Sequence, residues 1–253
     1  MSAEKHSPLD QFKIEPLIPF DIGGYNLSFT NSSLWMLIAV ASVTLFMTIA
    51  MSKKALVPGR LQSLAELTHG FVGNIIKENV GAEDGKKFFP LIFTLFTFIL
   101  FCNFLGMVPY SFTPTSHIIV TLSLALMVFL TVLLVGIFKH GFHFLGLFIP
   151  SGLPKVLVPI IFVIEIVSFM ARPVSLTIRL AAAMTAGHIL LKVFAGFVVS
   201  LMGFGAIGPV LGLALPMPLL VGMIGLEFFV CFLQAYIFAL LTSIYLHDAI
   251  HLH

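Results

Sequence analysis

The stretch of sequence that decides the fold is LPKVLVPIIFVIEIVSFMARPVSLTIRLAAAMTAGHILLKVFAGFVVSLMG, residues 153–203, in which apolar side chains continue for almost the whole length. A second stretch of the same character runs from about residue 209 to residue 247. A helix of roughly 40–50 residues would be about 60–75 Å long, whereas the hydrocarbon core of a bilayer is about 30 Å thick. Each stretch is therefore either two ordinary spans joined by a buried turn or one helix that lies far from the membrane normal.

Few residues interrupt these stretches. Gly203-Phe204-Gly205 and Gly208-Pro209 lie between the two and predict a turn. Within the first stretch only Arg172-Pro173 resembles a loop, so we expect one long helix with that dipeptide as the place for a kink. The sequence thus predicts a C-terminal hairpin of two long, strongly inclined membrane helices over residues 153–253.

The composition is that of a membrane protein. Hydrophobic side chains make up 59 % of the 253 residues and charged side chains only 9 %, against about 45–50 % and about 25 % in soluble domains. These residues cannot supply the charged exterior of a soluble domain, and they equally exclude a disordered chain and a disulfide scaffold. Because backbone polar groups in lipid must bond internally, the predicted fold class is an all-α integral membrane protein in a lipid bilayer.

The same inventory argues against several kinds of ligand. A net charge of +2 is too small to indicate a nucleic-acid partner. Cys102 and Cys231 lie within apolar stretches and are interpreted as core side chains, so we expect neither a metal site nor a cofactor. The sequence holds no Gly-rich phosphate loop or dinucleotide fingerprint, so we expect no nucleotide chemistry in this chain.

Three shorter apolar runs, Leu34–Met51, Phe88–Val108 and Ser116–Phe138, have the length of ordinary transmembrane helices. The N-terminal segment is polar and lacks the features of a signal peptide, so the first span is expected to remain as an anchor. Leu61–Val80 has apolar residues at helical spacing and predicts an amphipathic helix that lies on the membrane surface or docks on its neighbours. The expected division is 1–33 polar segment, 34–51 first transmembrane helix, 59–87 amphipathic and connecting segment, 88–138 transmembrane hairpin and 153–253 long hairpin.

Basic residues predict the orientation. Those that share one side of the predicted spans are Lys53, Lys54, Arg60, Lys77, Lys86, Lys87, Lys139 and Lys155. The loop over residues 109–115 on the opposite side carries no Lys or Arg, although Lys5 and Lys13 also fall on that side. The positive-inside rule then places the N-terminus outside and the basic segments in the cytoplasm or its equivalent.

Ionisable residues inside the predicted long hairpin are the strongest functional signal, because a charge at bilayer depth costs at least about 2.5–3.5 kcal/mol. They are Glu165, Arg172, Arg179, His188, Lys192 and Glu227. Arg172 and Glu165, seven residues apart on one face, are interpreted either as functional groups or as a structural ion pair. Lys155 and Lys192 are interpreted as side chains that extend to the membrane interface.

Arg179 differs from the others because no acid lies within two turns of it on its own helix and its neighbours are apolar or small. Small neighbours let another helix approach closely, and the guanidinium cannot lose its charge to reduce its cost. It must therefore face either water or a carboxylate, and an acid on a partner chain is a serious candidate for that carboxylate. If the two long helices form an antiparallel hairpin, Arg179 can meet Gln234, and His188 can meet Glu227. A histidine beside a carboxylate is the chemistry of a proton relay, whereas the alternative is a histidine that simply packs between helices.

Several motifs resemble one family, subunit a of the rotary F-type ATP synthase. They are PVSLTIRL at 173–180 with AGH at 186–188, GLE at 225–227 with LQAYIF at 233–238, YLHDAI at 245–250, and FCNFLGMVP at 101–109. These motifs occur in the family's order over about residues 60–253, and the combination of His188 with Glu227 is similar to that of mitochondrial and alphaproteobacterial members. One departure is Ala183, where members commonly carry Asn four residues after the arginine.

This resemblance implies a stator subunit of the Fo sector that couples transmembrane proton flow, through two half-channels and an essential arginine, to rotation of the c-ring. The residues it assigns to proton translocation are Arg179, Glu227, His188, Gln234 and Glu165, and further candidates for lining the channels are Asn103, Arg172, Tyr236, His247 and Asp248. The implied partners are c-ring subunits whose carboxylates face Arg179, b-type peripheral stalk subunits and other subunits of the complex. The expected location is the bacterial plasma (inner) membrane, with the mitochondrial inner membrane as the alternative, and H⁺ is favoured over Na⁺.

Two other function classes compete with this one. A secondary transporter would show inverted repeats and a self-contained site, and we find no internal repeat. A redox subunit would need paired haem ligands across two spans, whereas His140, His143, His247, His251 and His253 cluster near chain or membrane ends. A purely structural scaffold would not require Arg179 and Glu227 together within the membrane.

Overall fold

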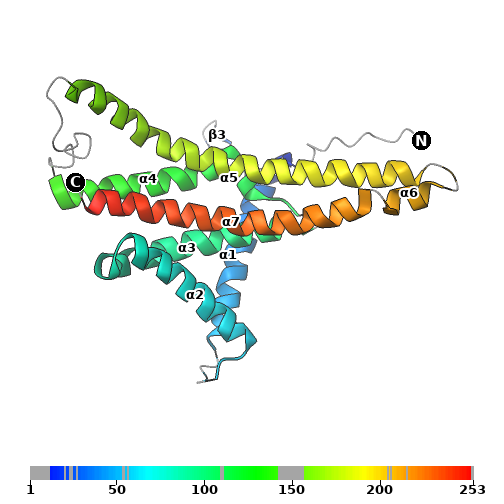
Figure 1. The fold of residues 1–253 in the computed structure, drawn as a ribbon, viewed down its shortest axis with the longest axis horizontal. Helices are drawn as coiled ribbons and strands as arrows, with labels where there is room; N and C mark the ends of the chain where they lie inside the picture. Colours follow the sequence, from blue (N-terminus) through cyan, green and yellow to red (C-terminus); the bar gives the residue numbers. More distant parts are fainter. Residues whose placement is uncertain are drawn as a thin grey trace. The chain divides into compact units, whose positions relative to one another are not determined.

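The computed structural model describes residues 12–19, 21–22, 25–26, 28–52, 55, 57–108, 111–141, 157–203, 205, 207–214 and 216–251. Figure 1 shows its helices, which are α1 (Asn31–Ala50), α2 (Arg60–Asn79), α3 (Ala82–Gly106), α4 (Ile118–His140), α5 (Val158–Met202), α6 (Gly208–Ala214) and α7 (Pro216–Ile250). A 3-10 turn, η2 (Pro114–Ser116), lies between α3 and α4. The expectation of an all-α integral membrane protein is confirmed.

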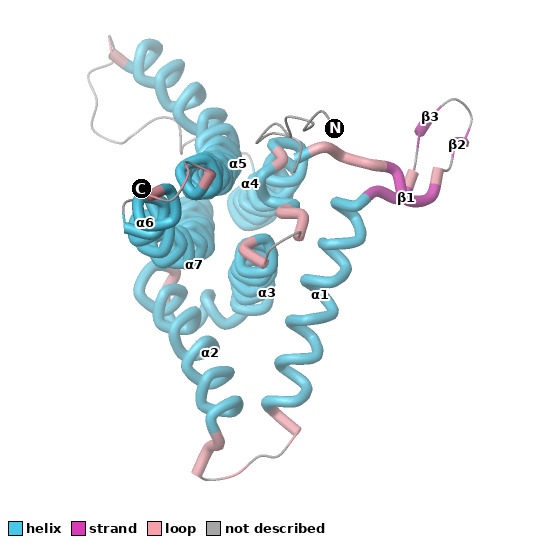
Figure 2. The backbone as a smooth tube through the Cα atoms, turned by 90° about the vertical axis from the view of Figure 1, so that its right-hand side faces the viewer, coloured by secondary structure: helices cyan, strands magenta, loops and turns pink. Residues whose placement is uncertain are grey.

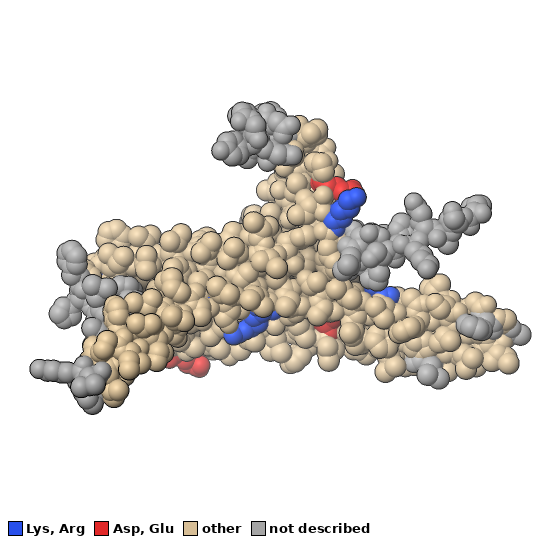
Figure 3. Space-filling model, turned by 90° about the horizontal axis from the view of Figure 1, so that it is seen from above, with Lys and Arg blue, Asp and Glu red and all other residues tan. Residues whose placement is uncertain are grey.

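Five helical segments among the described residues are long and apolar enough to cross a membrane, and they are Asn31–Ala50, Glu83–Gly106, Ile118–His140, Val158–Met202 and Gly208–Ile250. The surface agrees with this, since large apolar side chains such as Leu45, Val163 and Phe229 are about 60 % exposed. On the face drawn in Figure 3, Lys and Arg and Asp and Glu appear only as isolated spots among uncharged side chains. Such a surface is stable in lipid and not in water.

The helix ends differ somewhat from the predicted spans. α3 begins at Ala82 rather than Phe88, because Glu83 and Asp84 fall in its first turn, where negative charge favours a helix N-terminus. Gly81 just before it has a φ of 100°, which separates α3 from α2. The polar end of the helix therefore extends beyond the apolar run that the sequence makes visible.

The two long apolar stretches behave differently. α5 is one helix of 45 residues, about 68 Å long at the usual rise, and remains helical through Pro173. The second stretch is divided into α6 and α7, and α7 starts at Pro216, a residue that is favoured in the first turn, where its missing N–H removes no helical hydrogen bond. The expected turn between the stretches is present between α5 and α6, although Phe204 lies outside the described residues.

The N-terminal segment holds short strands that the sequence did not predict. β1 (Pro16–Ile18) pairs antiparallel with β4 (Phe29–Thr30), and β2 (Asp21–Ile22) pairs antiparallel with β3 (Tyr25–Asn26). Asn31 anchors this segment at the start of α1, since its side-chain amide donates to the Lys13 carbonyl at 3.0 Å. Figure 2 shows these strands at the N-terminal end of α1.

The chain divides into two compact units, and the first consists of Met1–Ser42, Ile99–His117 and Leu180–Gln234. The Asn103 side-chain amide on α3 donates to the Cys231 carbonyl on α7 at 3.2 Å, and the Thr185 hydroxyl on α5 donates to the Ser116 carbonyl at 3.1 Å. α6 packs tightly on the end of α5, because a Cβ at Gly208 would lie 2.6 Å from the Leu201 carbonyl oxygen. These contacts hold α3, η2 and parts of α5 and α7 together in this unit.

The second unit consists of Val43–Phe98, Ile118–Arg179 and Ala235–His253. Asp84 on α3 forms an ion pair with Lys139 on α4 at 3.3 Å. Aromatic pairs join α2 to α7 and α4 to α5, with ring centroids 5.6 Å apart for Phe71 and Tyr236 and 5.0 Å apart for Phe129 and Phe169. The docking of α2 through Phe71 shows that its apolar face contacts a neighbouring helix.

Candidate functional site

The first unit contains a buried histidine–carboxylate pair. Nδ1 of His188 on α5 lies 3.4 Å from Oε1 of Glu227 on α7, and the two residues are only 8 % and 3 % exposed. Gly187 permits this approach, because a Cβ at that position would lie 2.7 Å from Glu227 Oε1 and 3.0 Å from its Cδ. The structure therefore brings together the two residues that were expected to meet across the hairpin.

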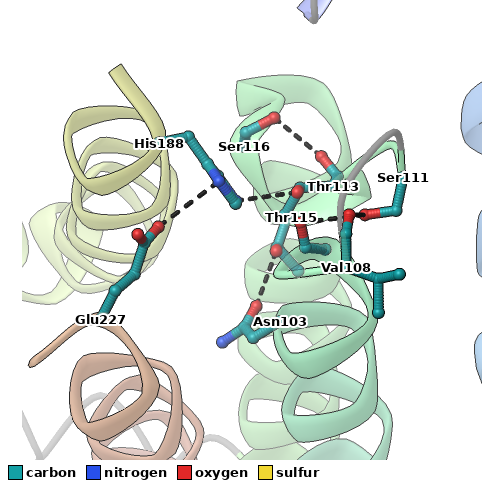
Figure 4. A network of polar contacts seen from close by, with 9 residues as sticks. Asn103, Val108, Ser111, Thr113, Thr115, Ser116, His188 and Glu227 are labelled. Atoms are coloured by element: carbon teal, nitrogen blue, oxygen red, sulfur yellow. Dashed lines mark hydrogen bonds and ion pairs between the residues drawn. The ribbon is translucent and has the colours of Figure 1, made fainter. Parts of the chain in front are cut away.

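Hydroxyl and amide groups continue from this pair into the turn between α3 and α4 (Figure 4). Thr113 Oγ1 is 2.9 Å from His188 Nε2, the ring nitrogen that points away from Glu227. In the same turn the Thr115 hydroxyl donates to Asn103 Oδ1 at 2.6 Å, and the Ser116 hydroxyl donates to the Thr113 carbonyl at 2.7 Å. Thr113, Thr115 and Ser116 are all buried, so this turn brings polar groups into the interior.

Sequence reasoning missed these hydroxyl residues. The signal that could have found them is the run SFTPTS at 111–116, in which four of six side chains carry a hydroxyl between two strongly apolar spans. Such a concentration of hydrogen-bonding groups at a membrane turn is costly to bury unless each is paired. Asn103, which was expected to line a channel, is paired with Thr115 and with the Cys231 carbonyl.

Beside Glu227 lies a cavity of about 330 Å³. It is bounded on α5 by Ala183, Ala186 and Gly187 and on α7 by Leu226 and Glu227. Among the described residues neither carboxylate oxygen of Glu227 has a hydrogen-bond partner. A buried carboxyl group that accepts no hydrogen bond is stable only when it is protonated, hydrated or opposite a positive charge. This geometry therefore suits a group that gains and loses a proton.

Arg179 lies on α5 with its side chain exposed. Its guanidinium donates to the Ser175 hydroxyl at 3.4 Å, and within the described part of the chain it takes part in no ion pair. Ala182 and Ala186, which follow it at helical spacing, are also exposed, so the face of α5 that carries Arg179 continues with small side chains. Gln234, which is half-buried on α7, belongs to the other unit, and its meeting with Arg179 stays a prediction.

Arg172 has a different partner from the one considered in the sequence. Its Nη1 is 3.0 Å from Asp248 Oδ2 on α7, and its guanidinium carbon lies 4.8 Å from the centre of the Tyr245 ring. The alternative that paired Arg172 with Glu165 is wrong, because seven residues put the two on one face but about 10 Å apart along the axis. Glu165 is half-buried and has no ion pair among the described residues.

The remaining predicted residues lie on the last half of α7. Tyr236 packs on Phe71, as described above, and the ring of His247 lies 4.7 Å from that of His251. No group of three or more His, Cys, Asp or Glu side chains with metal-binding geometry occurs among the described residues. His143 and His253 lie outside the described residues, as do Lys53, Lys54 and Lys155.

One titratable group of the turn lies outside the spans. The ring of His117 stacks on Phe112, with centroids 4.9 Å apart and planes 13° apart. Burial disfavours the charged ring and lowers the pKa of His117 below its ordinary range.

Comparison with known proteins gives one consistent result. The model of the family described as ATP synthase A chain matches residues 33–247. A protein named ATP synthase subunit a from Rhizobium etli (strain CIAT 652) is 54 % identical over 246 residues, which cover 97 % of this chain and 98 % of the relative. Proteins of the same name from Mesorhizobium japonicum and Parvibaculum lavamentivorans are each 52 % identical, over 251 and 244 residues that cover 99 % and 96 % of this chain and 99 % and 93 % of the relatives.

Proposed function

We infer a proton path from one premise: this chain belongs to the ATP synthase A chain family of proton-translocating Fo membrane subunits. The chain carries protons through two half-channels that Arg179 separates. In this proposal a proton from one side neutralises a carboxylate on a rotating ring of partner subunits. That carboxylate then travels through lipid and loses its proton into the second half-channel. Rotation of the ring then returns the charged carboxylate to Arg179.

The observation that carries this proposal is the exposed guanidinium of Arg179, which donates to the Ser175 hydroxyl at 3.4 Å and takes part in no ion pair among the described residues. A charge on the surface of a membrane helix is costly unless another group meets it, and two described acids of the long helices already have partners: Asp248 pairs with Arg172 and Glu227 with His188. Glu165 precedes Arg179 on α5 by about 21 Å along the helix axis, too far for the two side chains to meet on that helix. The adjoining small residues Ser175, Ala182 and Ala186 leave room for a partner helix to approach. These features support a passing carboxylate of a partner chain as the counter-ion.

Arginine suits this position for a chemical reason. Its guanidinium stays protonated at all physiological pH values, so it attracts a carboxylate but cannot hand a proton from one half-channel to the other. Each proton that crosses 100 mV releases about 2.3 kcal/mol, and a direct leak would waste it. A fixed positive charge between the two paths therefore couples proton flow to movement of the ring.

We assign His188, Glu227 and the adjoining cavity to the half-channel of the outer side. They belong to the same unit as η2 and the α5–α6 turn, the two turns that the distribution of basic residues predicts to be outside. Glu165, Tyr236 and His247 are candidates for the opposite half-channel. Arg172 and Asp248 neutralise each other, so within that half-channel they would act as a neutral pair.

The partners that follow from this proposal are a ring of c-type subunits opposite Arg179 and b-type stalk subunits that hold the chain against rotation. The transported ion is H⁺, because no cluster of additional oxygen ligands adjoins Arg179 among the described residues. The location is the bacterial inner membrane, as fits the alphaproteobacterial relatives.

The test is Arg179→Ala in the whole complex, with ATP-driven proton pumping measured in inverted membrane vesicles. We expect pumping to be abolished while the complex still assembles, since the side chain is exposed and takes little part in packing. Lys77→Ala is the control, because Lys77 is an exposed cation on α2, to which the proposal assigns no part of the proton path, and it should retain most of the pumping. Pumping that survives in Arg179→Ala would defeat the proposal.

A further inference from the structure

The proposed outer half-channel leaves one question open, which is how the buried His188 receives a proton. Its Nδ1 faces Glu227, and its other ring nitrogen faces Thr113 Oγ1 at 2.9 Å. The Thr113 side chain is therefore the polar group next to His188 on the side of the outer turn. We propose that the Thr113 hydroxyl positions the His188 ring and passes protons to it, an inference that rests on the proposed function.

The direction of this hydrogen bond depends on the tautomer of His188. A neutral imidazole has one N–H donor and one acceptor nitrogen. When the Thr113 hydroxyl donates to Nε2, the ring proton must sit on Nδ1, where it faces the Glu227 carboxylate. His188 is then ready to protonate Glu227, which it could not do with the opposite tautomer.

The transfer balances without any group beyond water. A hydronium ion on the outer side gives a proton to Thr113 Oγ1, whose own hydroxyl proton passes to His188 Nε2, and the Nδ1 proton passes to Glu227 Oε1. The products are water, an unchanged threonine, a neutral histidine with its proton on Nε2, and a neutral Glu227. The last transfer spans 3.4 Å, which a small rotation of the Glu227 side chain toward His188 shortens to a hydrogen bond.

Several features fix Thr113 in this position. Pro114 follows it and disfavours helical backbone before it, and Thr113 is extended, with φ −97° and ψ 101°. Its side chain sits against Gly106, where an added Cβ would lie 2.7 Å from Thr113 Cγ2 and 2.9 Å from its Cβ. The Ser116 hydroxyl holds its carbonyl at 2.7 Å. A β-branched side chain on such a backbone has little rotational freedom, so the hydroxyl stays directed at His188.

The decisive variants are Thr113→Val, which replaces the hydroxyl by a methyl of similar size, and Thr113→Ser, which restores the hydroxyl. Thr185→Val is the matched control, because Thr185 also donates a hydrogen bond from α5 to this turn, at 3.1 Å to the Ser116 carbonyl, but it does not contact His188. Each is introduced into the whole complex, and pumping is measured per assembled complex in vesicles. Arg179→Ala is measured alongside them.

We expect Thr113→Val to slow pumping about tenfold or more, as loss of a positioned proton donor does. Thr113→Ser and Thr185→Val should pump within about twofold of the parent rate, because both variants keep a hydroxyl at position 113 as the proton donor. Pumping by Thr113→Val at the parent rate, or an equal loss in Thr113→Ser or Thr185→Val, overturns the inference. If Arg179→Ala abolishes pumping while Thr113→Val leaves it intact, only the role of Thr113 fails; if Arg179→Ala pumps, the proposed function itself fails.

A second measurement keeps the inference testable if Thr113→Val assembles poorly. Nitrogen NMR of ¹⁵N-histidine-labelled complex, with the signal assigned by His188→Gln, reports which ring nitrogen carries the proton. We expect the Nδ1–H tautomer in the parent and a shift toward Nε2–H in Thr113→Val or Thr113→Ala. An unchanged tautomer in these variants would mean that Thr113 has only a packing role.

Discussion

Gly187 shapes the site at the scale of a single residue. It precedes His188 on α5, and its missing side chain lets the Glu227 carboxylate approach the helix backbone. The neighbouring Ala183 and Ala186 have short side chains as well, and the cavity beside Glu227 exists because of all three. Ala183 and Ala186 border this cavity on the side of α5. The carboxyl group therefore has room for water on one side and His188 on the other.

Gly187→Ala should slow proton pumping to about the extent of Glu227→Gln. The new methyl would overlap Glu227 Oε1 and force the carboxylate away from His188, whereas Glu227→Gln removes its ability to carry a proton. Both changes should be milder than Arg179→Ala, because the cavity can admit water in place of the lost contact. Initial pumping rates in vesicles give the measurement.

Gly196→Ala is the control for this change. It lies on the same helix, and nothing lies within 4 Å of an added Cβ there. It should leave pumping unchanged and stabilise the helix by about 0.5–1 kcal/mol. Equal pumping by Gly187→Ala and Gly196→Ala would show that the position of the Glu227 carboxylate does not limit proton flow.

At the scale of secondary-structure elements, one ion pair joins the two long helices in the second unit. Arg172 and Asp248 are 20 % and 28 % exposed at their side chains, so the pair is partly shielded from water. Phe169 and Tyr245 lie near the guanidinium, at 5.4 Å and 4.8 Å from its central carbon, and add cation–π attraction. The contact between α5 and α7 here is therefore electrostatic as well as apolar.

Asp248→Asn should destabilise the protein more than the double change Arg172→Gln with Asp248→Asn. The single change leaves a permanent positive charge in a partly buried site without its partner, whereas the double change removes both charges. We expect about 1–2 kcal/mol for the single change, between the values for exposed and fully buried pairs. A double-mutant cycle by thermal unfolding of the purified complex measures the coupling, and additive effects of the two single changes would contradict it.

At the scale of the whole molecule, the predicted sidedness connects the fold to the direction of proton flow. If each of the five apolar helical segments among the described residues crosses the membrane once, we expect residues around 51–59 and the C-terminus on one side and the α3–α4 and α5–α6 turns on the other. The outer assignment of His188 and Glu227 depends on this arrangement. If the chain had the opposite orientation in the membrane, His188 and Glu227 would belong to the inner half-channel instead.

Single cysteines and a membrane-impermeant maleimide test the orientation. Ser52→Cys and His251→Cys should be labelled only in inverted vesicles and Gly203→Cys only in right-side-out vesicles, and all three positions are exposed. The native Cys102 and Cys231 are buried and should stay unlabelled in both, which provides the background control. Labelling of Gly203→Cys from the same side as Ser52→Cys would refute the predicted orientation.

The sequence by itself determined the fold class and the set of membrane helices, because the transfer of apolar side chains into lipid depends on composition along a local window. It also identified His188, Glu227 and Arg179, since an ionisable residue in an apolar run is conspicuous wherever it packs. The β strands were missed because two or three residues are too few to show an alternating pattern. The early start of α3 was missed because it depends on Glu83 and Asp84, for which hydropathy gives no signal. The division of the chain into functional segments stays a prediction.

Only the tertiary structure decided two further partners, Thr113 for His188 and Asp248 for Arg172. Thr113 and His188 are separated by 75 positions in the chain, and Arg172 and Asp248 by 76. Which side chains meet over such separations depends on the rotation and sliding of one helix against another, which packing of apolar side chains fixes and hydropathy does not encode. A shift of one residue turns a helix by about 100°, enough to direct the His188 ring or the Asp248 carboxylate to a different neighbour.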